Sequence, residues 1–203
     1  TSSQGTFDKF FVLQAINELR HIVSSPELDN NKIISSKKEV LIENVIEAIE
    51  NDHKVLIFVN YLSSIESICN SLKENKIKFL KMTGQTKDRQ SLVDKFQSDN
   101  RYKVFVMTLK TGGVGLNLVS ADTIFIYDPW WNKTVENQAI DRAYRLGQDK
   151  TVFAYKMIMR NTIEEKILKL QEIKNKLLDD LISEDNLSTK NLSKSDIEFI
   201  LGS

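Results

Sequence analysis

Two arginines and a glutamine recur at helical spacing in the segment QAIDRAYRLGQ, residues 138–148. If that segment is helical, Gln138, Arg142 and Arg145 lie at i, i+4 and i+7 and share one face. Arginine is always charged and offers a planar fork of donors, which suits polyphosphate oxygens and the charge that develops on them during phosphoryl transfer. The alternative is a solvated face with ordinary salt bridges, because charged side chains are exposed by default.

A glycine-rich segment, TGGVGLN at residues 111–117, stands just upstream. A plain turn accounts for its glycines, which permit positive φ and close backbone approach. A dinucleotide fingerprint is a poor match, since Leu118 replaces the third glycine and no clear ribose-binding acid follows at the usual distance. The neighbouring residues make a functional site a more specific interpretation than a plain turn. Lys110 precedes the segment, and a strand ending in Asp128, two tryptophans and the arginine segment follow.

Several kinds of site are missing from the 203 residues. No G-x-x-x-x-G-K-[ST] loop occurs, and no Asp-Glu pair follows an apolar strand as in a magnesium-binding box. His21 and His53 are too few and too isolated for a metal site or a catalytic triad. Cys69 is the single cysteine, so no internal disulfide forms, and its helical context predicts a small buried side chain. We expect no metal site in this chain.

Composition describes an ordinary globular chain, 41% hydrophobic and 28% charged. The 28 basic and 28 acidic residues cancel, so any contact with nucleic acid must be local. No apolar run reaches membrane-spanning length and no signal peptide opens the sequence, which predicts a cytoplasmic protein without a membrane partner. Because the chain starts at Thr1 without an initiator methionine, we expect it to be a piece of a longer protein.

Short apolar runs alternate with amphipathic helical patterns through most of the chain. The runs predict strands at residues 55–59, 77–82, 104–108, 123–127 and 151–158, and the patterns predict helices at 36–51, 62–74, 87–97 and 138–148. Parallel strands need crossover connections, which helices supply, so the alternation predicts an α/β fold with a mainly parallel sheet between two helical layers. Ligands of such sheets bind at the carboxyl ends of the strands, where Asn60, Thr83 and Asp128 fall.

Helical patterns also flank this alternating region. Residues 7–23 predict an accessory helix, which ends in a loop around Pro26. Residues 163–181 carry apolar side chains at three- and four-residue spacing, which predicts an amphipathic helix that faces the core or a partner. We therefore divide the chain into residues 1–36, 37–162 and 163–203.

The motifs in combination resemble the second RecA-like lobe of a superfamily-two motor, in the wording of the SWI/SNF family of DNA-dependent ATPases. The similar segments are KVLIFVNYLSSIESICNSL, KMTGQTKDRQSLVDKFQSD, TLKTGGVGLNLVSADTIFIYDPWWN and QAIDRAYRLGQ. INELRHIVSSPEL resembles the family's leading segment, and TIEEKIL resembles the start of the helix that braces the two lobes. Gln85, Trp130 and Lys133 depart from the residues usual in the family, so the detail of the tryptophan loop is expected to differ.

This resemblance implies a role for each motif. Arg142 and Arg145 would be arginine fingers that enter an ATP site between two lobes, and Gln138 would help seat their helix at the nucleotide. Gly113 and Gly115 would let the backbone close on the ATP cleft, and Asp141 would orient a neighbour or form a structural pair with an arginine.

Four further residues would form part of a DNA track. Lys110, Thr111 and Asn117 would face the phosphate backbone of double-stranded DNA, and Trp131 would lie at the groove. The alternative for Trp131 is burial as a packing anchor.

The expected function is therefore half of an active site: the carboxyl-terminal lobe of a double-stranded-DNA translocase that hydrolyses ATP. The amino-terminal RecA-like lobe of the same polypeptide would bind most of the ATP and its Mg²⁺, so the isolated chain is expected to be inactive. A DNA-bound protein is a further expected partner. The composition, rich in Lys, Ile and Asn, hints at a bacterial, nucleoid-associated protein, or a nuclear one in a eukaryote. An RNA or strand-separating helicase and a non-catalytic interaction module remain alternatives.

Overall fold

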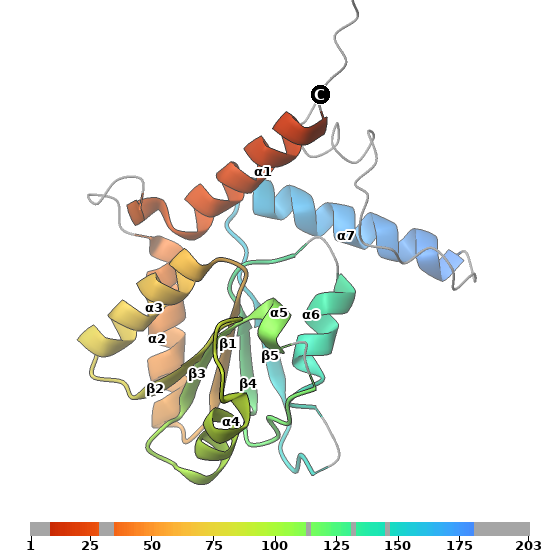
Figure 1. The fold of residues 1–203 in the computed structure, drawn as a ribbon. Coiled ribbons are helices and arrows are strands. Elements are labelled where there is room, and N and C mark those ends of the chain that lie inside the picture. The colour runs from red at the N-terminus through yellow and green to blue at the C-terminus, as the bar shows by residue number, and fades with distance from the viewer. Residues whose placement is uncertain (1–8, 29–34, 113–114, 131–132, 145–146, 181–203) are drawn as a thin grey trace, which may run out of the picture.

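The computed structural model describes residues 9–28, 35–112, 115–130, 133–144 and 147–180 (Figure 1). Five strands form one sheet in the order β2-β3-β1-β4-β5, and every pairing is parallel. The strands are β1 Val55–Val59, β2 Phe79–Met82, β3 Val104–Thr108, β4 Thr123–Ile126 and β5 Phe153–Lys156. The helices are α1 Lys9–Ser24, η1 Pro26–Leu28, α2 Ser36–Glu50, α3 Leu62–Glu74, α4 Arg89–Ser98, α5 Leu109–Gly112, α6 Lys133–Ile140 and α7 Ile163–Asp180. The predicted α/β fold with a parallel sheet is confirmed.

The central strand β1 explains why its sequence is apolar at every position. Successive side chains of a strand point to opposite faces, so Leu56 and Phe58 enter one core cluster while Val55, Ile57 and Val59 enter the other. All five side chains are buried, because helices cover both faces of the sheet.

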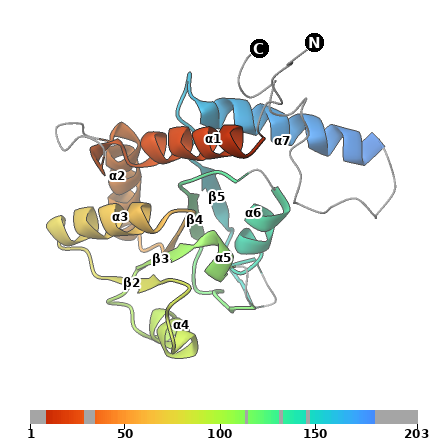
Figure 2. The same cartoon turned by 45° about the horizontal axis from the view of Figure 1, so that its top comes forward.

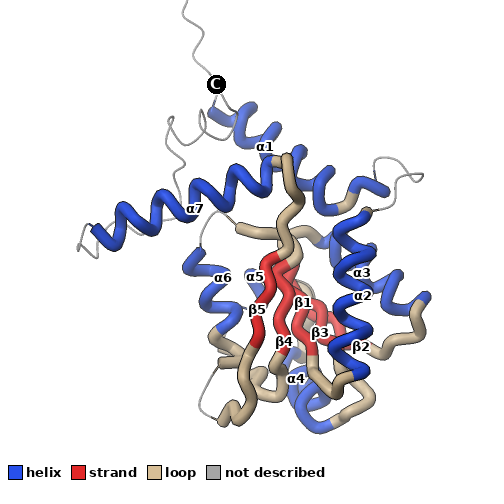
Figure 3. The backbone as a smooth tube through the Cα atoms, turned by 180° about the vertical axis from the view of Figure 1, so that it is seen from behind, coloured by secondary structure: helices blue, strands red, loops and turns tan. Residues whose placement is uncertain are grey.

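Two helical layers enclose the sheet (Figures 1 and 3). Helices α2 and α3 cover one face and bury Leu41, Val45, Ile68 and Leu72 against it. The other face carries α4, α5 and α6. Ser35 caps the first turn of α2, accepting a hydrogen bond from the Lys38 backbone N–H at 3.3 Å.

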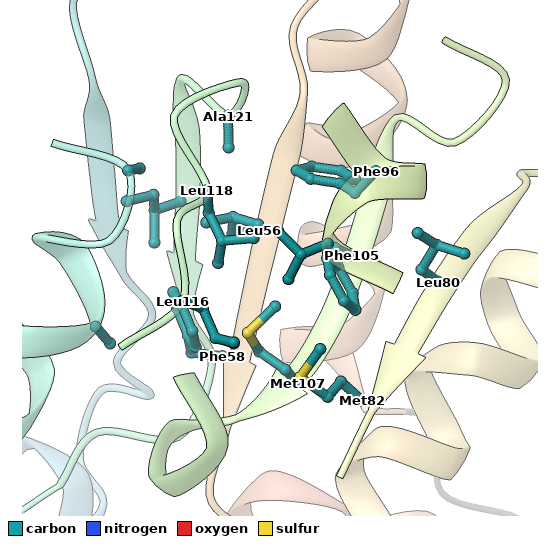
Figure 4. Close-up of a cluster of buried hydrophobic side chains, with 14 of the residues drawn as sticks. Leu56, Phe58, Leu80, Met82, Phe96, Phe105, Met107, Leu116, Leu118 and Ala121 are labelled. Carbon is teal, nitrogen blue, oxygen red and sulfur yellow. The ribbon is translucent and has the colours of Figure 1, made fainter. Parts of the chain in front are cut away.

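The end of the glycine loop and the residue after it belong to the core on the face that carries α4, α5 and α6. Leu116 and Leu118 point toward Leu56 and Phe58 of β1, as Figure 4 shows. Each fully buried leucine side chain contributes roughly 1.5–3 kcal/mol relative to an exposed one. The core therefore fixes the loop backbone on the face that carries α5 and α6.

Helices α1 and α7 lie side by side beyond the carboxyl ends of the strands (Figure 2). Ile16 of α1 packs against Ile163, Ile167 and Leu170 of α7 in a third apolar cluster. None of the helices in the described part of the chain is long and apolar enough to cross a membrane. The division of the chain into three segments stays a prediction.

The arginine segment differs from its predicted form. Helix α6 ends at Ile140, and the next residues form tight turns, with the Arg142 and Ala143 backbone N–H groups bonded to carbonyls three residues back. The prediction of one continuous helix over residues 138–148 is therefore wrong, because Gln138 lies in α6 and Arg142 lies in the turns after it. Arg145 lies outside the described residues.

Three predicted strands are shorter than expected, and β4 ends at Ile126 rather than at residue 127. β2 begins at Phe79 rather than at residue 77, and β5 spans only Phe153–Lys156. β4, to which β5 pairs, is itself four residues long, so the ladder offers partners for only four residues of the predicted 151–158 run.

Two leucines of α3 provide a matched test of this packing. Leu72 is fully buried and Leu62 is 55% exposed. We expect Leu72→Ala to lower the free energy of unfolding by about 2–5 kcal/mol through lost burial and an incompletely filled cavity. Leu62→Ala should change it by less than about 1 kcal/mol. Chemical denaturation measures both, and equal losses would contradict the layer arrangement.

Cys69 is buried, as its sequence context predicted, and burial raises the pKa of its thiol to about 11. At pH 8 only about one thiol in a thousand is then the reactive thiolate. We expect a thiol-specific disulfide reagent to modify the folded chain at least about a hundredfold more slowly than the chain in denaturant. Rapid modification in native buffer would contradict the burial of this side chain.

Candidate functional site

The candidate site begins where β3 ends and the short helix α5 starts. Lys110 is exposed, whereas Thr111 is only 3% exposed and its hydroxyl lies 2.6 Å from the hydroxyl of Thr108. The Thr111 backbone N–H also donates to the Thr108 hydroxyl, at 3.3 Å. Of the two residues predicted to face DNA here, Lys110 reaches solvent and Thr111 holds the turn.

The second half of the glycine loop alternates between solvent and core. Gly115 is exposed and has φ of +53°, in the left-handed region where a residue without Cβ is favoured. Asn117 is exposed between the buried Leu116 and Leu118, and its carbonyl accepts a hydrogen bond from Gln97 Nε2 at 2.6 Å. Gly113 lies outside the described residues.

Hydrogen bonds join residues 118–121, directly after the glycine loop, to the arginine segment. The Leu118 backbone N–H donates to the carbonyl of Arg142 at 3.0 Å. Gln148 Nε2 lies 2.8 Å from the carbonyls of Val119 and Ala121 and 3.2 Å from that of Ala143. Val119 and Ala121 precede Gln148 by 29 and 27 residues. Their contacts with Gln148 therefore hold the two motifs together as one unit.

Gly147 allows the chain to reach this position. Its φ is +101°, which strongly favours glycine. The turn directs Gln148 back to the loop, so a glycine–glutamine pair after the second arginine has a local structural reason. Sequence analysis assigned no role to Gln148.

Helix α6 and the turns directly after it carry the remaining candidates of the ATP cleft. Ala139 and Ala143 are buried in the core, whereas Gln138 and Asp141 are exposed and Arg142 is half-buried. An exposed amide and a guanidinium close to a glycine loop can donate hydrogen bonds to anionic oxygens. The arrangement is suited to an anionic ligand at the surface formed by α5, α6 and the glycine loop.

Residues at the carboxyl ends of β1 and β4 are used within the fold. Asp128 is 1% exposed and accepts hydrogen bonds from the Asn60 backbone N–H at 2.9 Å and from the Ser24 hydroxyl. Asn60 Nδ2 donates to the carbonyl of Asp128. These two side chains, which the strand-end rule offered as candidates, instead anchor the sheet edge to α1.

The tryptophan loop also has partners that sequence analysis missed. The Trp130 backbone N–H donates to Glu136 at 2.6 Å, and the carbonyl of Trp130 accepts from Gln171. Glu136 is 1% exposed, which its place in a helix one turn after two tryptophans could have indicated. Trp131 lies outside the described residues. No group of three or more His, Cys, Asp or Glu side chains that could hold a metal ion occurs among the residues that the structure describes.

The parallel sheet with this surface defines the class as a RecA-like helicase lobe. The sequence matches the family described as "Helicase conserved C-terminal domain" over residues 36–147. The chain belongs to this family, and its relatives and structural neighbours place it among the SWI/SNF-type ATPases.

Three relatives illustrate this similarity. An "Uncharacterized ATP-dependent helicase" of Mycoplasma pneumoniae is 39% identical over 87% of the chain and 17% of the relative. The "Putative ATP-dependent helicase/translocase YwqA" of Bacillus subtilis is 36% identical over 98% of the chain and 22% of the relative. The SWI2/SNF2 ATPase core domain of Sulfolobus solfataricus superposes with a TM-score of 0.74 at 29% identity, covering 98% of this chain and 42% of that one. The chain thus spans about a fifth of the length of the Mycoplasma and Bacillus relatives.

Removing the Gln148 amide tests the joint between the two motifs. Gln148→Leu leaves the carbonyls of Val119, Ala121 and Ala143 without this donor, and we expect a loss of about 1–3 kcal/mol in the free energy of unfolding. Gln90→Leu is the control, because Gln90 is exposed and, among the described residues, its amide donates to Asp94 of its own helix. An equal effect of both substitutions on chemical denaturation would contradict the joint.

Proposed function

We propose that this chain is the carboxyl-terminal motor lobe of an ATP-dependent translocase that acts on double-stranded DNA. Arg142 and Arg145 act as arginine fingers, Gln138, Gly113, Gly115 and Asp141 line the ATP cleft, and Lys110, Thr111, Asn117 and Trp131 form part of the DNA track. The proposal extends family membership to particular residues. A DNA-bound protein is the expected further partner, and the DNA of a bacterial cell the expected location, or the nucleus in a eukaryote.

The observation that carries the proposal is the hydrogen-bonded unit of glycine loop and arginine segment. Because Leu118 and Gln148 tie the two motifs together, a shift of the loop moves Arg142 with it. Such a joint gives DNA contacts around Lys110 and Asn117 a short mechanical path to the ATP cleft.

The division of labour follows from what this sequence contains. It has arginines that suit the charge on a transferring phosphoryl group, but no phosphate-cradling loop with lysine and no magnesium-binding box. We assign most of the ATP and the Mg²⁺ to an amino-terminal RecA-like lobe of the same polypeptide. ATP supplies the γ-phosphoryl group whose hydrolysis drives the motor. The residues of this chain donate hydrogen bonds to that group and exclude water when the lobes close.

Lobe closure and opening would produce movement along the duplex. With ATP between the lobes, the arginines draw this lobe toward the other, and loss of phosphate after hydrolysis lets them separate. If each lobe grips the DNA backbone in turn, the alternation advances the motor. The isolated lobe lacks its partner and is expected to be inactive.

A strand-separating helicase is the second candidate, because the relatives from Mycoplasma pneumoniae and Bacillus subtilis carry the word helicase in their names. The two functions differ in their products. A strand-displacement assay with a labelled duplex distinguishes them, since a translocase moves along the duplex without releasing a strand.

Single arginine substitutions in the full-length polypeptide test the finger assignment. Arg142→Ala and Arg145→Ala should each lower DNA-stimulated ATP turnover by about 10³-fold or more, while duplex binding stays within a few-fold. Arg101→Ala is the matched control, because Arg101 is exposed and pairs only with Asp99 in the described contacts. Turnover by either finger variant within a few-fold of the control would remove that residue from the cleft.

A further inference from the structure

The backbone of Pro129 and Trp130, which we term the tryptophan junction, is held by three different helices. Arg20 Nη2 of α1 donates to the carbonyl of Pro129 at 2.6 Å. The Trp130 N–H donates to Glu136 Oε1 of α6 at 2.6 Å, and the carbonyl of Trp130 accepts from Gln171 Nε2 of α7. Each polar backbone atom of the junction therefore has a side-chain partner, and no two partners come from the same helix.

Burial of the Arg20 guanidinium beside the tryptophan junction removes it from water, which is unfavourable for a charged group. Arg20 is 2% exposed, and its guanidinium carbon lies 5.6 Å from the ring centroid of Tyr61 and 5.1 Å from that of Trp130. Burial lowers the pKa of Arg20 and raises the pKa of Tyr61 to about 12. A buried guanidinium is tolerated only where aromatic rings and carbonyls replace its water, so its position is closely defined.

Glu136 and Gln171 form a second buried group on the other side of the junction. Lys156 Nζ lies 2.5 Å from Glu136 Oε2 and 3.0 Å from Gln171 Oε1. Gln171 Nε2 also approaches Glu136 Oε1 at 3.4 Å. Both Glu136 and Gln171 are at most 3% exposed, so their contacts are made away from solvent.

We propose that Arg20, Glu136 and Gln171 are positioning residues that make the response of the motor to DNA depend on α1 and α7. The inference rests on the proposed function, because it concerns how tightly duplex DNA engages the lobe. It assigns no catalytic step to the three side chains. They act through the tryptophan junction and through the start of α6.

The tryptophan junction lies next to residues with proposed roles in the motor. Trp130 is the residue before Trp131, the proposed groove contact, and Lys133 begins the helix that leads to Arg142. Gln171 and Arg20 belong to helices outside the two layers that enclose the sheet (Figure 2). A displacement of α1 or α7 would therefore shift the part of the chain that is proposed to meet the duplex.

The test uses Gln171→Met in the full-length polypeptide, with Gln90→Met as control. Methionine keeps the length of the side chain but cannot donate to the carbonyl of Trp130. We expect the duplex concentration for half-maximal ATPase stimulation to rise about tenfold, while ATP turnover without DNA stays within about twofold. Backbone amide exchange at Trp130 should become faster in Gln171→Met and remain unchanged in Gln90→Met, whose side chain is exposed on α4.

Each outcome bears on the inference. Equal losses with and without DNA, or an unchanged half-saturating concentration, would overturn it, because a merely structural residue does not act selectively on DNA engagement. If no duplex stimulates the wild-type polypeptide, the proposed function fails and the dependence on DNA fails with it. Faster exchange at Trp130 would then still support the holding of the junction, and unchanged exchange would overturn that as well.

Discussion

A buried carboxylate at the carboxyl end of β4 constrains the rest of this structure. Asp128 is 1% exposed, and a buried charge is tolerated only when it is hydrogen-bonded. Its partners are the backbone of Asn60 and the hydroxyl of Ser24, so the accessory helix α1 must close over the sheet edge. Tyr127, the residue before Asp128, donates to the carbonyl of Ser24 at 2.9 Å. This bond also holds α1 to the sheet edge.

Helix α7 is held to the same edge by a second buried charge. Lys37 and Glu164 are 2.5 Å apart, and both side chains are at most 2% exposed. Burial raises the pKa of Glu164, although the charge of Lys37 opposes the shift. Since α1 packs on α7 through Ile16, the two helices form one cover over the carboxyl edge. The surface of α5, α6 and the glycine loop lies beside this cover, and it is where we propose the ATP cleft and the DNA track.

Much of the fold could be predicted from the sequence because local pattern and burial agree. The continuous apolar run at residues 55–59 required a strand covered on both faces, and β1 has those bounds. The arginine segment shows where pattern fails: its spacing suits a helix, but α6 ends at Ile140 and the next residues form tight turns. The roles of Arg20 and Gln171 could not be found, because their partners Pro129 and Trp130 lie 109 and 41 positions away along the chain and leave no local pattern.

We propose above all that this chain is half of an ATP-hydrolysing site that duplex DNA stimulates. The most direct measurement compares ATP hydrolysis, with and without duplex DNA, by this chain alone and by the full-length polypeptide. We expect no ATP turnover by the chain alone and strong stimulation of ATP turnover by duplex DNA in the full-length protein. Turnover by the chain alone, or no stimulation in the full-length protein, would contradict it.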